Sequence, residues 1–145
     1  FGGYVAADDS IIDLCINRSK SFIYTSALPS FLVKISLDRL EQNRKIRQKI
    51  LEKNTSLLSS GLKEIGYDIK SPTHIIPIII GDEKKTLGFG KYLFECGIFA
   101  QPIRYPTVPK NSARIRLSVT AWISKKQIEY TLSIFEKAGK KFKIL

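Results

Sequence analysis

Apolar residues recur along much of the chain at the three- and four-residue steps that are typical of helices. From about residue 31 to residue 65 they predict one long amphipathic helix, which can contain a break, and Gly66 marks its end. A shorter helix is expected to begin within residues 9–14, where acidic side chains favour the positive end of a helix dipole. The capping-box spacing of Ser124 and Gln127 predicts a last helix, which reaches about Lys141.

The segment between the long and the last helix has the pattern of a small sheet. Residues 74–80 read as a buried strand in which Pro77 favours an edge position. Residues 83–96 predict a helix and residues 98–101 a short strand. This helix is expected to turn four side chains to the core: Leu87, Tyr92, Leu93 and Cys96. The order strand, helix, strand, strand, helix predicts an α/β sandwich, with a short, mostly antiparallel sheet and helices on one face.

Two arginines fall on one face of the strand that follows. Residues 104–109 carry two prolines and are expected to be extended. Beyond them Ile115 and Leu117 point to one side of a strand, and Arg114 and Arg116 point to the other. A guanidinium holds a carboxylate or phosphate with two parallel hydrogen bonds. The pattern also fits a structural ion pair or a solvated strand face, so it leaves the role of the arginines open.

Composition fits one soluble globular domain of 145 residues with a formal net charge of +11. The longest apolar run, residues 75–80, is too short to cross a bilayer. So large a positive charge is typical of proteins that bind polyanions, and a non-catalytic nucleic-acid-binding domain is one hypothesis. The cations are not interleaved with exposed aromatic residues on one strand face, and they lie mostly in two helical stretches, Arg39–Lys53 and Lys125–Lys143. That placement favours solvated helix faces.

Few residues in the chain suit metal binding or thiol chemistry. Cys15 and Cys96 lack metal-ligand spacing and have apolar neighbours, which predicts reduced thiols of a cytosolic protein. His74 is the single histidine and has no partner for a catalytic triad, so we expect a structural role. No metal site is predicted.

Four motifs together resemble the C-terminal part of a known enzyme family. They are Phe1-Gly2-Gly3-Tyr4-Val5-Ala6, the segment from Arg18 to Pro29, the segment from Ile76 to Asp82, and Ala113-Arg114-Ile115-Arg116-Leu117-Ser118. In this order they resemble the α-oxoamine synthases over the whole chain. These are fold type I enzymes that use pyridoxal 5'-phosphate (PLP) to join an amino acid to an acyl-CoA with loss of carbon dioxide. The resemblance implies a cytoplasmic homodimer that binds neither nucleic acid nor membrane.

The resemblance also implies how the chain is divided. Residues 1–30 would end the large PLP-binding domain, residues 31–66 would be a long interdomain helix, and residues 67–145 would be a small C-terminal α/β domain. In the family the lysine that bonds PLP precedes the glycine pair, so we expect it upstream of Phe1. No catalytic residue is then expected in this chain, which would be inactive alone.

Four residues match positions that bind substrate or cofactor in the family. Arg116 matches the arginine that holds the carboxylate of the amino acid, and Arg114 would support it from the same face. Thr25 and Ser26 match hydroxyls that reach the PLP phosphate of the neighbouring subunit. From pattern alone these two hydroxyls read as turn residues that bond local backbone.

The proline-containing loop indicates a branch of the family. Residues 103–109 most resemble the 8-amino-7-oxononanoate synthases of biotin biosynthesis, which condense L-alanine with pimeloyl-CoA or its carrier-protein thioester. The alternative is 2-amino-3-ketobutyrate CoA ligase, which uses glycine and acetyl-CoA. One departure is Ala121-Trp122-Ile123, where the family often has Ala-Ala-His. Any role of that histidine does not carry over to this chain.

Overall fold

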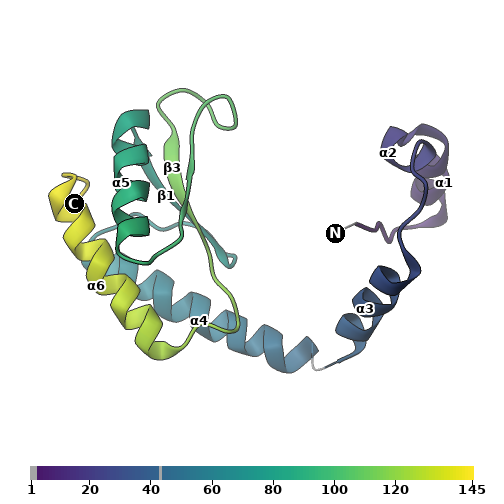
Figure 1. Ribbon diagram of the computed structural model, residues 1–145, viewed down its shortest axis with the longest axis horizontal. Coiled ribbons are helices and arrows are strands. Elements are labelled where there is room, and N and C mark those ends of the chain that lie inside the picture. Colours follow the sequence, from purple (N-terminus) through teal and green to yellow (C-terminus); the bar gives the residue numbers. More distant parts are fainter. Residues whose placement is uncertain (1–2, 43) are drawn as a thin grey trace. The chain divides into compact units, whose positions relative to one another are not determined.

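The computed structural model describes residues 3–42 and 44–145, which form two compact units, Phe1–Arg44 and Lys45–Leu145 (Figure 1). Phe1 and Gly2 of the first motif, and Asn43 within the predicted long helix, lie outside the described residues. None of the described helices is both long enough and apolar enough to cross a membrane.

The first unit contains three helices and a loop. They are α1 (Asp9–Arg18), α2 (Lys20–Ile23) and α3 (Ser30–Glu41), and residues 24–29 connect the last two. The helix expected from residues 9–14 is therefore confirmed. Neither α1 nor α2 has a buried residue. The apolar side chains of this unit are largely exposed, as Phe22, Phe31 and Leu37 illustrate.

The long helix predicted for residues 31–66 is divided into two helices, and the prediction allowed for such a break. The second of them is α4 (Arg44–Ile65), and Gln42 directly after α3 adopts an extended backbone with φ −83° and ψ 116°. No apolar residue occurs between Leu40 and Ile46. The apolar stripe that stabilises an amphipathic helix is interrupted over these residues, which explains why the helix ends.

The second unit is built on a three-stranded antiparallel sheet in the order β1-β3-β2, which confirms the predicted fold class. The strands are β1 (Ile75–Gly81), β2 (Gln101–Ile103) and β3 (Ala113–Ser118), and helix α5 (Glu83–Glu95) connects β1 to β2. Pro77 lies in an edge strand, as expected, where a residue without an N–H group removes no bond from the centre of the sheet.

Two details around β2 differ from the predictions. The strand begins at Gln101 and not at residue 98, because the Ile98 N–H bonds the Leu93 carbonyl at 2.9 Å and closes the end of α5. Residues 104–109 are not extended throughout, since the Thr107 N–H donates to the Arg104 carbonyl at 3.0 Å in a turn.

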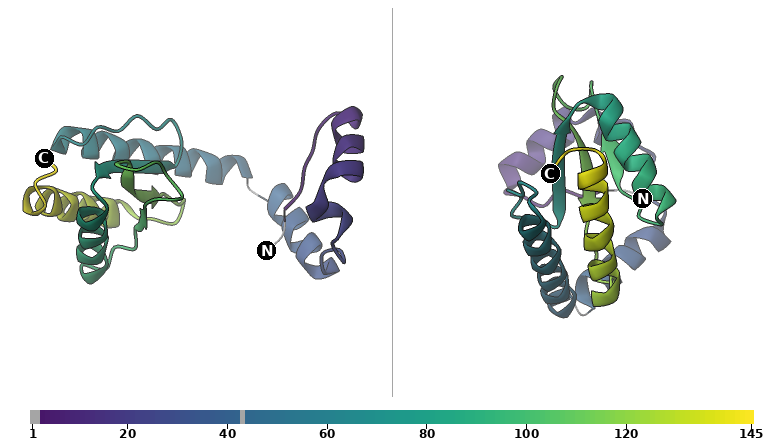
Figure 2. Two further views of the ribbon diagram at one scale, coloured as in Figure 1. Left: turned by 90° about the horizontal axis from the view of Figure 1, so that it is seen from above. Right: turned by 90° about the vertical axis from the view of Figure 1, so that its left-hand side faces the viewer.

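Three helices cover one face of the sheet and enclose the core. Helix α6 (Lys125–Lys141) lies between α4 and α5 (Figure 2, right), and its predicted capping box between Ser124 and Gln127 is present. The α4–α6 contact is close, since a Cβ on Gly61 would lie 2.4 Å from the Leu132 side chain. Fully buried residues of the sheet and helices meet here: Leu62, Ile76, Phe89, Leu93, Ile115 and Phe135. The opposite face of the sheet carries no helix of this unit.

Helix α5 packs on the core through three of the four residues predicted, Tyr92, Leu93 and Cys96, and differs at Leu87. Its buried residues are Thr86, Phe89, Gly90 and Leu93, whereas Leu87 is 46% exposed. Tyr92 and Cys96 are half-buried against the core, as expected. The stripe follows the helical steps i, i+3, i+4 and i+7, but a threonine and a glycine occupy two of its positions. Apolar spacing therefore misplaced Leu87 and did not identify Thr86 and Gly90 as core positions.

Candidate functional site: an arginine-bearing sheet face

The two predicted arginines lie side by side on the open face of the sheet. β3 is the central strand, and its residues alternate, with Ala113, Ile115 and Leu117 buried. Burial of these side chains against the helices fixes the opposite direction for Arg114 and Arg116. The structure therefore brings the two guanidiniums to one surface, as the strand pattern predicted.

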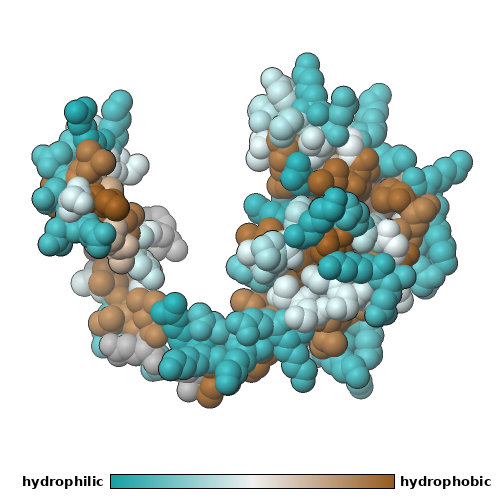
Figure 3. Space-filling model, turned by 180° about the vertical axis from the view of Figure 1, so that it is seen from behind, coloured by the Kyte–Doolittle hydropathy of each residue, from teal (hydrophilic) through white to brown (hydrophobic). Residues whose placement is uncertain are grey.

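Cross-strand neighbours of the arginines form two flanking rows. Arg116 lies opposite Pro77 of β1 and Gln101 of β2, and Arg114 lies opposite Ile79 and Ile103. Ser118 continues the central row opposite Ile75. We call this surface the arginine face, and it consists of Ile75, Pro77, Ile79, Gln101, Ile103, Arg114, Arg116 and Ser118. Apolar surface is interspersed with hydrophilic side chains over this unit (Figure 3).

Arg114 and Arg116 differ in their partners. Arg114 is half-buried, and its Nε donates a hydrogen bond of 3.0 Å to the Ser112 carbonyl. Arg116 is exposed. Among the described residues neither arginine forms an ion pair with a carboxylate, and the arginine face contains no acidic residue. Two positive charges without a counter-charge favour an anionic ligand, and the planar fork of Arg116 suits a carboxylate.

Thr25 and Ser26 lie in the loop between α2 and α3 of the first unit. Both are exposed, and within the described residues neither hydroxyl has a hydrogen-bond partner. The Thr25 N–H approaches the Phe22 carbonyl at 3.4 Å, and Ala27 has a left-handed backbone with φ 74°. The turn interpretation required that both hydroxyls bond local backbone. In the described residues they do not. They can therefore donate to a phosphate, which fits the PLP that the resemblance implies.

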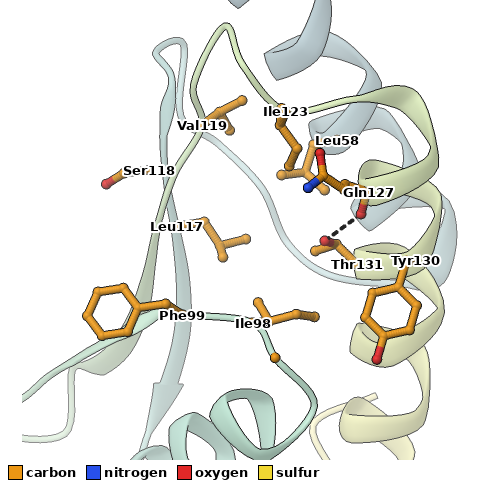
Figure 4. Close-up of a pocket in the computed structure, with 11 residues that line it drawn as sticks. Leu58, Ile98, Phe99, Leu117, Ser118, Val119, Ile123, Gln127, Tyr130 and Thr131 are labelled. Carbon is orange, nitrogen blue, oxygen red and sulfur yellow. Dashed lines mark hydrogen bonds between the residues drawn. The ribbon is translucent and has the colours of Figure 1, made fainter.

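A small pocket of about 240 Å³ lies on the helix side of the sheet (Figure 4). Leu117 and Val119 point into it while Ser118 points away (Figure 4). Two of the hydroxyls at the pocket are already bonded, since Tyr130 donates to the Cys96 carbonyl at 3.0 Å and Thr131 to the Gln127 carbonyl at 2.8 Å. None of the described residues that line it is charged. An anionic substrate is therefore better matched by the arginine face.

Sequence reasoning did not single out Gln101, which the structure places directly opposite Arg116. The strand expected at residues 98–101 ended at Gln101, and its pairing partner could not be read from the chain. Only the register between β2 and β3 brings this polar side chain to the arginine face.

The family of the chain follows from a family model described as aminotransferase class I and II, which matches residues 1–135. The chain belongs to this family. Relatives named 8-amino-7-oxononanoate synthase cover almost all of it. Those from Thermoanaerobacter pseudethanolicus and Treponema denticola are 41% and 40% identical over 99% of the chain. The chain spans about 37% of the length of these relatives.

Solved structures agree with the fold. The 8-amino-7-oxononanoate synthase from Francisella tularensis matches 95% of this chain and 41% of its own, with a TM-score of 0.73 and 24% identity. A serine palmitoyltransferase from S. paucimobilis with bound PLP-myriocin matches 92% of this chain and 35% of its own, with a TM-score of 0.79 and 22% identity. At these identities the likeness establishes the fold, which is that of the C-terminal part of these enzymes.

Proposed function

We propose that this chain is the C-terminal part of a PLP-dependent acyltransferase, most specifically an 8-amino-7-oxononanoate synthase. That enzyme condenses L-alanine with a pimeloyl thioester, carried by CoA or an acyl carrier protein, and releases carbon dioxide. The observation that carries the proposal is the exposed Arg116 without a carboxylate partner among the described residues, on an open sheet face. Relatives at about 40% identity bear this enzyme's name.

The same proposal assigns the parts of the chain. Residues 1–30 end the large domain, and residues 67–145 form the small domain, with the helices of residues 31–66 between them. Exposed apolar residues of the first unit, such as Phe22 and Phe31, would be covered by the rest of the large domain in a homodimer. Thr25 and Ser26 then bind the PLP phosphate of the neighbouring subunit.

Each proposed site residue has a distinct physical task. Arg116 holds the amino-acid carboxylate through two parallel hydrogen bonds and so fixes how the substrate is oriented, and Arg114 adds positive charge beside it. Thr25 and Ser26 donate hydroxyl hydrogens to phosphate oxygens. PLP, when bound, supplies the electron sink for the carbon–carbon bond-forming chemistry. This chain therefore contributes binding and orientation.

The test of the proposed function is turnover by the full-length enzyme. Purified enzyme is supplied with L-alanine and pimeloyl-CoA, and separately with glycine and acetyl-CoA, and release of the free CoA thiol is followed. We expect turnover with the first pair at a higher kcat/KM. The reverse preference would indicate 2-amino-3-ketobutyrate CoA ligase, and thiol release with neither pair would contradict the proposed function.

A further inference from the structure

Arg116 has one polar neighbour across the sheet. Its partner in β1 is Pro77, which has no side-chain donor or acceptor, and its partner in β2 is Gln101. Gln101 and Arg116 are both exposed on the arginine face. Residues directly opposite in an antiparallel pair have Cβ atoms about 5 Å apart, which is within reach of two long side chains.

The two arginines are held by different means. The Nε of Arg114 already bonds the Ser112 carbonyl at 3.0 Å, and both cross-strand neighbours of Arg114 are isoleucines. Within the described residues Arg116 forms no such bond to backbone or to a carboxylate. An unrestrained guanidinium on a long stem loses rotational freedom when it binds a ligand, and that loss weakens binding.

Gln101 is itself firmly placed, although its strand is short. Ala100 before it is only 6% exposed, and Pro102 after it packs against α5, where a Cβ on Gly90 would lie 2.5 Å from Pro102 Cγ. Pro102 also pairs with the fully buried Ile115. These contacts on both sides fix Gln101 toward the arginine face.

The geometry points to Gln101 as a positioning residue for Arg116, an inference that rests on the proposed function. The structure shows no hydrogen bond between the two side chains, and the inference is that in the full-length enzyme the Gln101 amide oxygen accepts one from a guanidinium N–H. A guanidinium has five N–H donors, so two remain on another edge for the substrate carboxylate. Gln101 thus orders Arg116 before the amino acid arrives and acts through it, without touching the substrate itself.

The test is the variant Q101L in the full-length enzyme. We expect the KM for the amino acid to rise about tenfold, because a hydrogen bond to a charged group is lost, while kcat changes little. The KM for the acyl thioester should stay constant. Q48L makes the same exchange on the exposed side of α4 and should leave both constants unchanged. If Q101L does not fold, Q101T decides the question, because its side chain suits a strand but is too short to reach Arg116.

A double variant tests whether Gln101 acts through Arg116. In Q101L/R116K the rise in KM should equal that of R116K alone, because the group that Gln101 positions is already gone. Additive effects of the two changes would overturn the inference, as would an unchanged KM in a folded Q101L enzyme. These outcomes differ from failure of the proposed function, in which the unmodified enzyme itself would release no thiol.

Discussion

Arg114 and Arg116 project from the same face of β3, but only Arg114 has a hydrogen bond to the backbone. A pair of lysine substitutions separates their roles. R116K keeps the charge and loses the fork, so the KM for the amino acid should rise about 10- to 100-fold with PLP still bound. R114K should raise it less, because Arg114 is partly engaged by the Ser112 carbonyl. Steady-state kinetics of the full-length enzyme measure both KM values. The control is R44K, at the exposed first residue of α4. Equal KM values for R116K and the unmodified enzyme would remove Arg116 from the site.

Tyr67 links the end of α4 to α6 and makes the stability of the second unit depend on pH. It is 5% exposed, and its hydroxyl donates to the Phe135 carbonyl at 2.8 Å. Burial raises the pKa of Tyr67 well above its ordinary value. Y67F should lower the free energy of unfolding at neutral pH by about 1 kcal/mol, because that hydrogen bond is lost. The exposed Tyr130, which bonds the Cys96 carbonyl, offers Y130F as a control with a smaller effect.

The raised pKa of Tyr67 gives the pH dependence its sign. The unfolded state releases the phenol proton near pH 10, while the folded state keeps it, so stability is full below about pH 10 and falls as the pH rises further. Urea unfolding of this chain at about pH 8 and about pH 11 measures the loss. Y67F should lose less stability over this range than the unmodified chain. An equal loss in both would contradict the assignment to Tyr67.

Helix α5 and strand β2 meet at Gly90, where the absence of a side chain sets how closely they pack. A Cβ there would lie 2.5 Å from Pro102 Cγ and 3.5 Å from Ile115 Cδ1. Alanine normally stabilises a helix relative to glycine by about 1 kcal/mol. In G90A the clash should outweigh this gain and lower the free energy of unfolding by about 1–3 kcal/mol.

G88A is the matched control in the same helix. Its Cβ would meet the Phe142 ring at 3.1 Å, and Phe142 is a half-buried side chain near the C-terminus that can tilt. We expect G88A to be neutral or stabilising in thermal unfolding. A stabilising G90A would show that β2 shifts without cost and would weaken the argument that Gln101 is firmly placed.

Elements set by local sequence could be predicted, and elements set by distant contacts could not. The capping box at Ser124 and the alternation around Arg116 involve neighbouring residues, so the pattern alone sufficed. The close approach of α5 to β2 depends on Gly90 meeting Pro102, and the position of Gln101 depends on strand register. Neither contact can be recognised from the spacing of hydrophobic residues. The break between α3 and α4 falls within residues 41–45, which contain no apolar residue, and the prediction allowed for a break without placing it.

The two units differ in how much of their apolar surface is buried. Among the described residues, all the buried hydrophobic ones belong to the second unit, from Leu58 to Ala138, whereas α1 and α2 bury none. Residues 45–145 produced alone should therefore unfold cooperatively in urea, and residues 1–44 alone should show little helix by circular dichroism. A cooperative transition for residues 1–44 would contradict this division.

The central claim is that Arg116 on the arginine face binds the carboxylate of the amino-acid substrate. The most direct test titrates the full-length enzyme and its R116K variant with L-alanine and with glycine, following the visible absorbance of PLP. The account predicts a saturable spectral change at lower concentration with L-alanine than with glycine, and a large rise in both midpoints in R116K. Identical midpoints in the two proteins would contradict it.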